Sequence, residues 1–205
     1  DRLIPWSRNY KNKLIEFFKN HQEYKIVHVH QDCLSSVALK CAKKSNIPVR
    51  IAHSHNSSQD KNFKYLIKLF YMKKIPGSAT HLFACSKVAG DWMFRGHDFK
   101  ILKNSIDTTS YLYNPLLSSK IKKNLKIEDN FVIGHVGRFN PQKNHSFLID
   151  IFKECKKIDK SSKLVLVGDG DGRKGIEEKV RSNGLDKDVI FLGVQNNVNE
   201  LLQAM

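Results

Sequence analysis

The stretch Phe131–Asn144, FVIGHVGRFNPQKN, decides how the fold of this 205-residue chain is read. It opens with a short apolar run, Phe131–Ile133, which is broken by Gly134 and resumes at Val136, and this is typical of a buried strand in a parallel sheet. A polar turn containing Pro141 follows the run. From Asn144 onward apolar residues recur in steps of three and four, which predicts a helix. The stretch is therefore predicted to be a strand, a turn and a helix.

Two cations, Arg138 and Lys143, lie in this turn, just past the carboxyl end of the predicted strand. Ligands of open α/β sheets bind at that edge. A guanidinium fork together with an ammonium group suits a diphosphate. The chain contains 35 lysines and arginines, so a merely solvated basic loop is the alternative that this pair alone does not exclude.

The composition, 40% hydrophobic and 27% charged, is ordinary for a globular protein, but the net charge of +15 is not. Such a charge favours polyanionic partners: nucleic acid, an anionic membrane face or a phosphorylated ligand. We see no apolar run of the roughly 18 residues that would span a bilayer and no signal peptide. We therefore expect a cytoplasmic protein, with peripheral attachment at the inner face of the membrane as an option. The scattered cysteines are expected to be reduced thiols: Cys33, Cys41, Cys85 and Cys155.

Apolar and amphipathic segments alternate along the whole chain, which favours an α/β fold built from βαβ units. Strands are predicted at 24–30, 48–55, 80–85, 100–103, 131–136, 163–167 and 189–192. Helices are predicted at 12–20, 34–44, 60–74, from Ser86 to about 94, at 144–158 and at 175–183, and another begins near residue 199. The pattern weakens between 110 and 130, where we place the domain boundary. The predicted domains are 1–115 and 116–205.

A glycine-rich turn, GDGDGR at 168–173, directly follows the predicted strand KLVLV. Glycines after a strand let backbone amides approach a phosphate closely. The spacing is not that of the dinucleotide fingerprint, and a calcium loop would need more oxygen ligands and a distal glutamate. A plain turn between strand and helix is the alternative.

Two HxH pairs, His28 with His30 and His53 with His55, lie on predicted strands, and each pair presents both rings on one strand face. Paired histidines can supply zinc ligands. There are two stronger alternatives: histidines whose ring nitrogens are hydrogen-bonded in a core, or polar groups at the carboxyl edge of a sheet. We therefore predict no metal. Only His55 lies at the very end of its strand, where a substrate would bind.

The predicted helix 60–74, DKNFKYLIKLFYMKK, interleaves lysines with aromatic and aliphatic residues. A basic amphipathic helix of this kind can lie on an anionic membrane surface. In the alternative, the apolar face of this helix packs on the sheet. Membrane contact and packing on the sheet can both apply to the same helix. Because no zinc-finger, RRM or helix-turn-helix pattern is present, we expect no nucleic-acid partner.

Several segments together resemble one family, the retaining glycosyltransferases of family 4, the group 1 type. GRFNPQKNHSFLIDIF, LVLVGDGDGR and VIFLGVQNNVNELLQAM resemble its nucleotide-sugar half, and HVHQ, RIAHSHN, FACSKVAGDWMF and LKNSID resemble its acceptor-side half. The resemblance implies the GT-B fold, in which two Rossmann-like domains face each other across a cleft. Both domains would be incomplete in this chain.

The resemblance also implies a role for each matching residue. His55 corresponds to a catalytic histidine near the reacting sugar, and His53 belongs to the same cleft. The donor diphosphate would be bound by Arg138, Lys143, Gly137, Gly168 and Gly170. The nucleotide base would lie near Leu192, Gly193 and Val194. Asn104 and Asp107 match an Asn-Gly-Ile-Asp segment of the acceptor cleft, with Ser105 in place of the glycine.

The function implied is transfer of a hexose, with retention of configuration, from a UDP- or GDP-linked sugar to a surface-polysaccharide or lipid-linked acceptor. An Arg/Lys pair would stabilise the charge on the departing diphosphate, without a cofactor or metal. The family's first strand is expected before Asp1 and its two-glutamate motif after Met205, so we expect this chain alone to be inactive or nearly so. The alternatives are a GT-B sugar-nucleotide epimerase, a basic nucleic-acid-binding α/β protein and, more distantly, a metal-dependent hydrolase.

Overall fold

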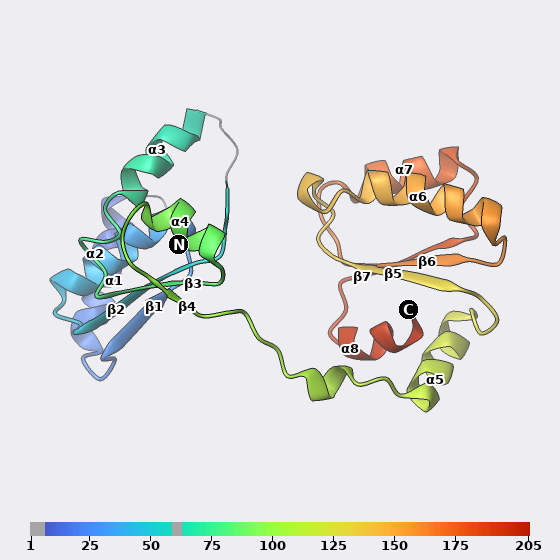
Figure 1. The fold of residues 1–205 in the computed structure, drawn as a ribbon, viewed down its shortest axis with the longest axis horizontal. Helices are drawn as coiled ribbons and strands as arrows, with labels where there is room; N and C mark the ends of the chain where they lie inside the picture. The colour runs from blue at the N-terminus through green and yellow to red at the C-terminus, as the bar shows by residue number, and fades with distance from the viewer. Residues whose placement is uncertain (1–6, 59–62) are drawn as a thin grey trace. The chain divides into compact units, whose positions relative to one another are not determined.

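The computed structural model describes residues 7–58 and 63–205 and divides the chain into two compact units, Asp1–Ser105 and Ile106–Met205 (Figure 1). The sequence prediction had divided the chain between residues 115 and 116. Each unit contains one sheet whose strands are all parallel. The predicted α/β class is therefore confirmed.

Unit 1 carries a four-stranded sheet in the order β1-β2-β3-β4. Its strands are β1 (Ile26–Val29), β2 (Val49–Ser54), β3 (His81–Ala84) and β4 (Lys100–Ile101). Its helices are α1 (Arg8–Asn20), α2 (Ser35–Lys44), α3 (Phe63–Met72) and α4 (Lys87–Phe94), with a short 3-10 turn, η1 (Asp32–Leu34). Ser86 caps α4, because its hydroxyl accepts a hydrogen bond from the amide of Ala89 at 3.2 Å. Residues 60–62 of the predicted basic helix lie outside the described residues.

The core of unit 1 lies on one face of its sheet. Val29, Ala52 and Ala84 project from three neighbouring strands into this core, where they meet Leu39 of α2 and Phe94 of α4. Because strand side chains alternate between faces, the intervening residues project from the other face. That second face carries all the HxH histidines.

Unit 2 carries a three-stranded sheet in the order β5-β6-β7. Its strands are β5 (Val132–Val136), β6 (Lys163–Val167) and β7 (Val189–Gly193). Its helices are α5 (Pro115–Leu125), α6 (His145–Ile158), α7 (Arg173–Ser182) and α8 (Val198–Leu201), with 3-10 turns η2 (Thr108–Tyr111), η3 (Pro141–Lys143) and η4 (Leu202–Ala204). Helices α6 and α7 cover one face of this sheet and α5 and α8 cover the other (Figure 1).

The alternation along β6 shows why this sheet needs two helical layers. Leu164 and Leu166 pack with α6 and α7, whereas Val165 and Val167 pack with α5 and α8, and all four side chains are buried. A strand that is apolar on both faces is what a covered parallel sheet requires.

Helix α5 corrects the sequence analysis, which gave 110–130 no regular structure. Asn114 caps this helix by accepting a hydrogen bond from the amide of Leu117 at 3.1 Å, and Pro115 occupies its first turn. Ile121 is buried against the sheet. Asn114-Pro115, within the segment where we placed the domain boundary, is here the start of a helix.

Candidate functional site

Two loops lie side by side at the carboxyl edge of the unit 2 sheet, one after β5 and one after β6. The amide of Gly137 donates to the carbonyl of Val167 at 2.9 Å, and the amide of Phe139 donates to the carbonyl of Asp169 at 3.1 Å. The amide of Gly172 returns a hydrogen bond to the carbonyl of Phe139 at 3.0 Å. The turn with the predicted basic pair and the predicted glycine turn therefore form one continuous backbone platform.

Glycine is required at two positions of this platform. Gly168 has a φ of +131°, and a Cβ there would lie 2.1 Å from the carbonyl oxygen of Gly137. Gly170 has a φ of +155°, and its Cβ would lie 2.7 Å from the carbonyl oxygen of Phe139. Any side chain would push the loops apart, so the glycines are explained by close packing of backbone on backbone.

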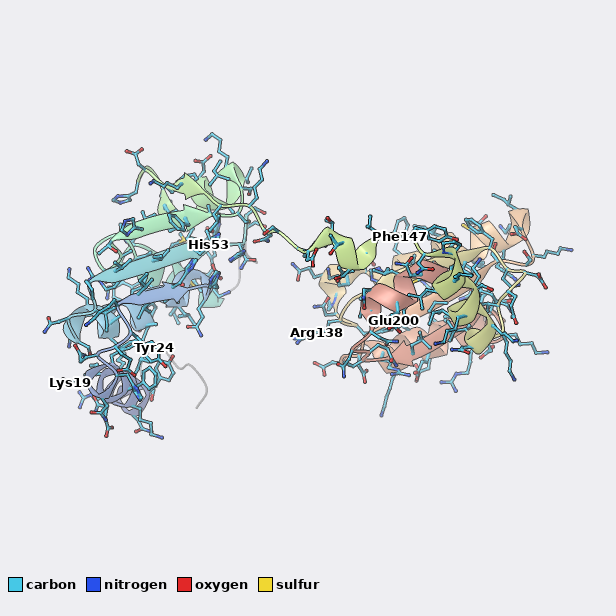
Figure 2. All side chains as sticks on the ribbon, turned by 90° about the horizontal axis from the view of Figure 1, so that it is seen from below. Lys19, Tyr24, His53, Arg138, Phe147 and Glu200 are labelled. Atoms are coloured by element: carbon cyan, nitrogen blue, oxygen red, sulfur yellow. The ribbon has the colours of Figure 1, made fainter. Side chains whose placement is uncertain are left out.

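Arg138 and Lys143 are both exposed at this platform, and Arg138 lies at the edge of its unit in Figure 2. Among the described residues neither cation has a carboxylate within salt-bridge distance. The stem of Lys143 passes over Gly137, where a Cβ would lie 3.4 Å from its methylenes. Two cations without a carboxylate partner, beside a glycine platform, are arranged to bind an anion.

A cavity of about 290 Å³ opens between the two loops. Its lining consists of Arg138, Phe139, Asn140, Pro141, Gly170, Asp171 and Gly172. Asn140 is held in place because its side-chain oxygen accepts a hydrogen bond from the amide of Lys143 at 3.0 Å. Asn144 then begins α6 in the left-handed region, with φ +48°, and its side chain accepts from the amide of Phe147 at 3.4 Å.

Arg173 is a further cation of this edge to which the sequence analysis gave no role. Its guanidinium lies 2.7 Å from a carboxylate oxygen of Glu177 and 3.7 Å from one of Asp169, and stands over the ring of Phe191. It is therefore already paired, unlike Arg138. Its position just after the glycine turn, with Asp169 and Glu177 each four residues away, was the available signal.

The segment predicted to lie near the nucleotide base borders the glycine turn. The amide of Gly168 donates to the carbonyl of Gly193 at 2.7 Å. Gly193 adopts a φ of +69°, and Val194 is exposed. The side chain of Gln195 donates to the carbonyl of Leu192 at 2.7 Å and closes the turn. The structure thus brings the predicted base segment to the platform.

Two histidines under the basic turn, the buried His145 and the half-buried His135, were missed by the sequence analysis. His145 stacks on Phe139 at a centroid distance of 4.0 Å, and His135 meets it edge-on at 4.7 Å. Burial lowers the pKa of His135, and the charge of Lys143 adds to this. Burial also lowers the pKa of His145, with His135 and Lys143 as further causes. Neutral rings therefore support the loop without adding charge next to the basic pair.

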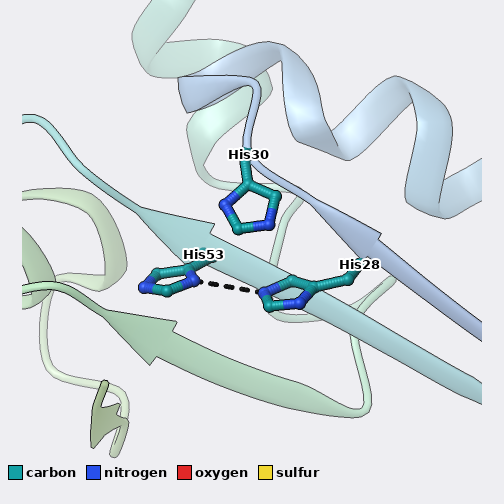
Figure 3. A group of neighbouring side chains, drawn as sticks. All are labelled: His28, His30 and His53. Carbon is teal, nitrogen blue, oxygen red and sulfur yellow. Dashed lines mark hydrogen bonds between the residues drawn. The ribbon is translucent and has the colours of Figure 1, made fainter. Parts of the chain in front are cut away.

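The four histidines of unit 1 form one cluster, called here the histidine cluster: His28, His30, His53 and His55. His28 Nε2 lies 3.1 Å from His53 Nδ1, and His30 Nδ1 lies 2.8 Å from His55 Nε2. Figure 3 shows the first three rings gathered on β1, β2 and the loop after β1. The prediction that each HxH pair shares a strand face is confirmed, and the two pairs also meet each other.

Desolvation and mutual repulsion favour the neutral form of three rings of this cluster, His28, His30 and His53. Burial lowers the pKa of His53 to about 4, with His55, His30 and His28 adding to the shift. The pKa values of His28 and His30 are also lowered, first by burial and then by neighbouring histidines. Uncharged imidazoles at neutral pH are hydrogen-bonding groups, general bases or metal ligands.

Asn104 and Asp107 are exposed and lie on either side of the division between the units. The carboxylate of Asp107 accepts hydrogen bonds from the amide of Thr109 at 3.0 Å and its hydroxyl at 2.6 Å. These bonds lower its pKa and start η2.

Helix α3 exposes apolar side chains among its lysines. Leu66 is 68% exposed and Phe70 is 56% exposed, and the ammonium of Lys74 lies 3.5 Å from the ring centroid of Phe70. Packing on unit 1 therefore leaves much of the apolar surface of α3 uncovered within this chain. Within the described residues, no helix is long and apolar enough to cross a membrane.

Comparison with known proteins places these features in a family. Residues 118–205 match the family described as glycosyl transferases group 1. The chain is 33% identical to the putative glycosyltransferase EpsF of Bacillus subtilis, over 98% of this chain and 54% of that protein. It is 26% identical to the capsular polysaccharide biosynthesis glycosyltransferase CapH of Staphylococcus aureus, over 94% of this chain and 54% of that protein. The chain thus spans about half the length of these relatives.

Solved structures of glycosyltransferases share the fold. The crystal structure of Anabaena Alr3699/HepE in complex with UDP and glucose matches with a TM-score of 0.81 at 21% identity, over 99% of this chain and 57% of that one. The crystal structure of WaaG, a glycosyltransferase involved in lipopolysaccharide biosynthesis, matches with a TM-score of 0.63 at 14% identity, over 94% of this chain and 68% of that one. The predicted fold class, Rossmann-like domains of the GT-B type, is confirmed.

Proposed function

This chain belongs to the group 1 glycosyl transferases through its residues 118–205, and on that premise we propose that the protein transfers a hexose from a nucleotide-diphosphate sugar to a saccharide or lipid-linked acceptor. One observation carries the proposal. Arg138 and Lys143, which have no carboxylate partner among the described residues, stand beside a glycine platform at the carboxyl edge of the unit 2 sheet. We propose that unit 2 binds the donor and unit 1 the acceptor.

The chemistry requires such a pair. Breaking the bond between sugar and phosphate leaves negative charge on the departing nucleoside diphosphate. Arg138 supplies a fork of donors and Lys143 a point charge, and both are already in place before the charge develops. We propose that these residues, rather than a metal or cofactor, neutralise the diphosphate.

The identity of the donor and the acceptor is proposed from the relatives. A structure of Anabaena Alr3699/HepE was obtained in complex with UDP-glucose, which favours a UDP-linked donor here. CapH is named for capsular polysaccharide biosynthesis, which favours a surface polysaccharide as the product. We further propose that transfer retains the configuration of the sugar and that His55 lies next to the reacting carbon.

The surface of unit 1 supports a location at a membrane. The exposed Leu66 and Phe70 of α3, with Lys68 and Lys74 beside them, fit the headgroup layer of an anionic membrane. We propose that the protein is cytoplasmic and attaches peripherally at the inner face, where a lipid-linked acceptor would be found.

Calorimetric titration of the chain with UDP, GDP, uridine and inorganic pyrophosphate, at millimolar ligand, tests the donor proposal. Because the diphosphate supplies most contacts, we expect UDP and pyrophosphate to bind and uridine to bind at least about tenfold more weakly. Raising the salt concentration should weaken UDP binding. Binding of a short oligonucleotide in preference to UDP, with a steep salt dependence, would instead support the nucleic-acid alternative.

A further inference from the structure

The histidine cluster has a geometry that glycosyl transfer does not require. His28, His30 and His53 each offer one imidazole nitrogen, and these nitrogens all lie within 4.8 Å of one another. We propose that these residues bind one divalent transition-metal ion, for which Zn²⁺ is the test case. This revises the prediction from sequence, which assigned no metal to the chain.

Strand pairing brings the ligands together. In the parallel register of β1 and β2, His28 pairs with Ile51. His53 lies two residues after Ile51, so its side chain projects from the same face of the sheet as that of His28. His30 follows His28 by two residues and therefore returns to that face just after β1. The site is assembled by backbone hydrogen bonds of the sheet, so its ligands are held close without a bound ion (Figure 3).

The spacing suits tetrahedral coordination. Nitrogens that bind Zn²⁺ at about 2.0–2.1 Å in a tetrahedral site lie about 3.3 Å from one another. His28 Nε2 and His53 Nδ1 are already 3.1 Å apart. The three nitrogens lie within 4.8 Å of one another, so their spacing exceeds the tetrahedral value by at most about 1.5 Å. Ring rotations that move the His30 nitrogen by that distance or less would complete the coordination by three histidines.

The protonation state and the surroundings also suit a metal. Partial desolvation and neighbouring histidines lower the pKa values of all three rings, so each ring is uncharged at neutral pH. The proton of the His28–His53 hydrogen bond would move to the other nitrogen of its ring when an ion binds. His28 and His30 are exposed, which leaves a path for the ion and a fourth position for water. Imidazole nitrogens favour Zn²⁺, Cu²⁺ and Ni²⁺ over Mg²⁺ or Ca²⁺.

His55 supports the site from outside the ligand set. Its Nε2 lies 2.8 Å from His30 Nδ1, so His55 fixes the orientation of the His30 ring when the other His30 nitrogen faces the ion. A bound metal would then also restrain His55, the proposed neighbour of the reacting sugar. Metal occupancy would in this way act on the acceptor side without touching the donor platform of unit 2.

The test is a Zn²⁺ titration of the untagged chain at pH 7.5, against a chromophoric chelator, with wild type and four variants. His28→Gln and His30→Gln remove exposed ligands, so the fold should be retained. His81→Gln is the matched control, because His81 lies on the neighbouring strand β3 outside the three-histidine group. Cys85→Ser controls for thiol binding, since the Cys85 sulfur lies 3.8 Å from the carbonyl of His55.

We expect one Zn²⁺ per wild-type chain, an affinity at least about tenfold lower in His28→Gln and His30→Gln, and unchanged affinity in both controls. Long-range ¹H–¹⁵N spectra of wild type should show the rings of His28, His30 and His53 changing together as Zn²⁺ is added. Equal affinity in wild type and His28→Gln, loss of binding in Cys85→Ser, or the absence of saturable binding would overturn the proposal. The spectra decide the question even if a variant fails to fold.

Discussion

The backbone of Gly168 illustrates how a single residue sets the donor platform. Its Cβ would meet the carbonyl oxygen of Gly137 at 2.1 Å, so Gly168→Ala must move one loop away from the other. We expect this variant to lose at least about 2 kcal/mol of unfolding free energy, measured by urea denaturation.

Gly175→Ala is the matched control for that experiment. Gly175 lies in α7 and a Cβ there would meet nothing within 4 Å. Alanine favours the helical backbone, so this variant should gain about 0.5–1 kcal/mol. If both substitutions destabilise equally, the loop packing is not what requires glycine at 168.

The histidine cluster predicts how stability depends on pH. A histidine in an unfolded chain has a pKa of about 6.5, whereas burial lowers the pKa of His53 in the folded chain to about 4. Between these values the unfolded chain binds more protons than the folded one, so the free energy of unfolding should fall as the pH falls from about 6.5 towards 4.

Urea denaturation at several pH values measures this slope in metal-free buffer. His53→Gln should show a shallower fall than wild type, whatever its stability at pH 7. The His53 ring is bordered by three further histidines, His28, His30 and His55. The pKa values of His28 and His30 are also lowered, so the stability of His53→Gln should keep part of its pH dependence. Identical slopes for the two proteins would contradict the assignment to His53.

At the level of single residues, the sequence predicted Arg138 and Lys143 at the sheet edge because a polar turn follows an apolar strand. The Arg173–Glu177 pair lies four residues apart on one helix, a spacing that a sequence can indicate, but the contact between His135 and His145 beneath the basic turn could not be predicted. That contact joins β5 to α6, and only folding determines it.

At the level of elements, Asn144 joins η3 to α6 in the left-handed region while its side chain caps the helix. Asn144→Ala removes the cap and keeps the unfavourable backbone angle, so we expect a loss of about 1–2 kcal/mol. Asn144→Gly removes the cap but relieves the backbone, and should lose clearly less. Thermal denaturation of both variants measures the difference, and an equal loss in both would contradict this account of the turn.

Strands and long amphipathic helices were predictable because a buried parallel strand is continuously apolar and a covering helix repeats every three to four residues. Strand β6, Lys163–Val167, has the bounds that the sequence predicted. Helix α5 was not predicted, because lysines dominate its exposed side and few apolar positions mark the buried one. Tertiary contact with β5 and β6, rather than local pattern alone, stabilises such a helix.

At the level of the whole molecule, a long exposed stretch of the described chain joins the two units. Residues 100–116 are all exposed, and residues 102–107 have no regular structure. Limited trypsin digestion should therefore produce an early cut after Lys103 and a resistant fragment that begins at Asn104, identified by intact mass. Early cuts within 132–193 would show that unit 2 is not the compact body described here.

The most direct test of the central claim, that Arg138 and Lys143 bind the donor diphosphate, is a titration of UDP into wild type, Arg138→Ala/Lys143→Ala and the control Lys153→Ala/Lys187→Ala. The control removes the same charge from exposed positions of unit 2 outside the turn. We predict at least about 100-fold weaker binding in the first double variant and a change below about threefold in the control. Equal weakening in both variants would show attraction by net charge alone, and unchanged binding in the first would contradict the proposed donor site.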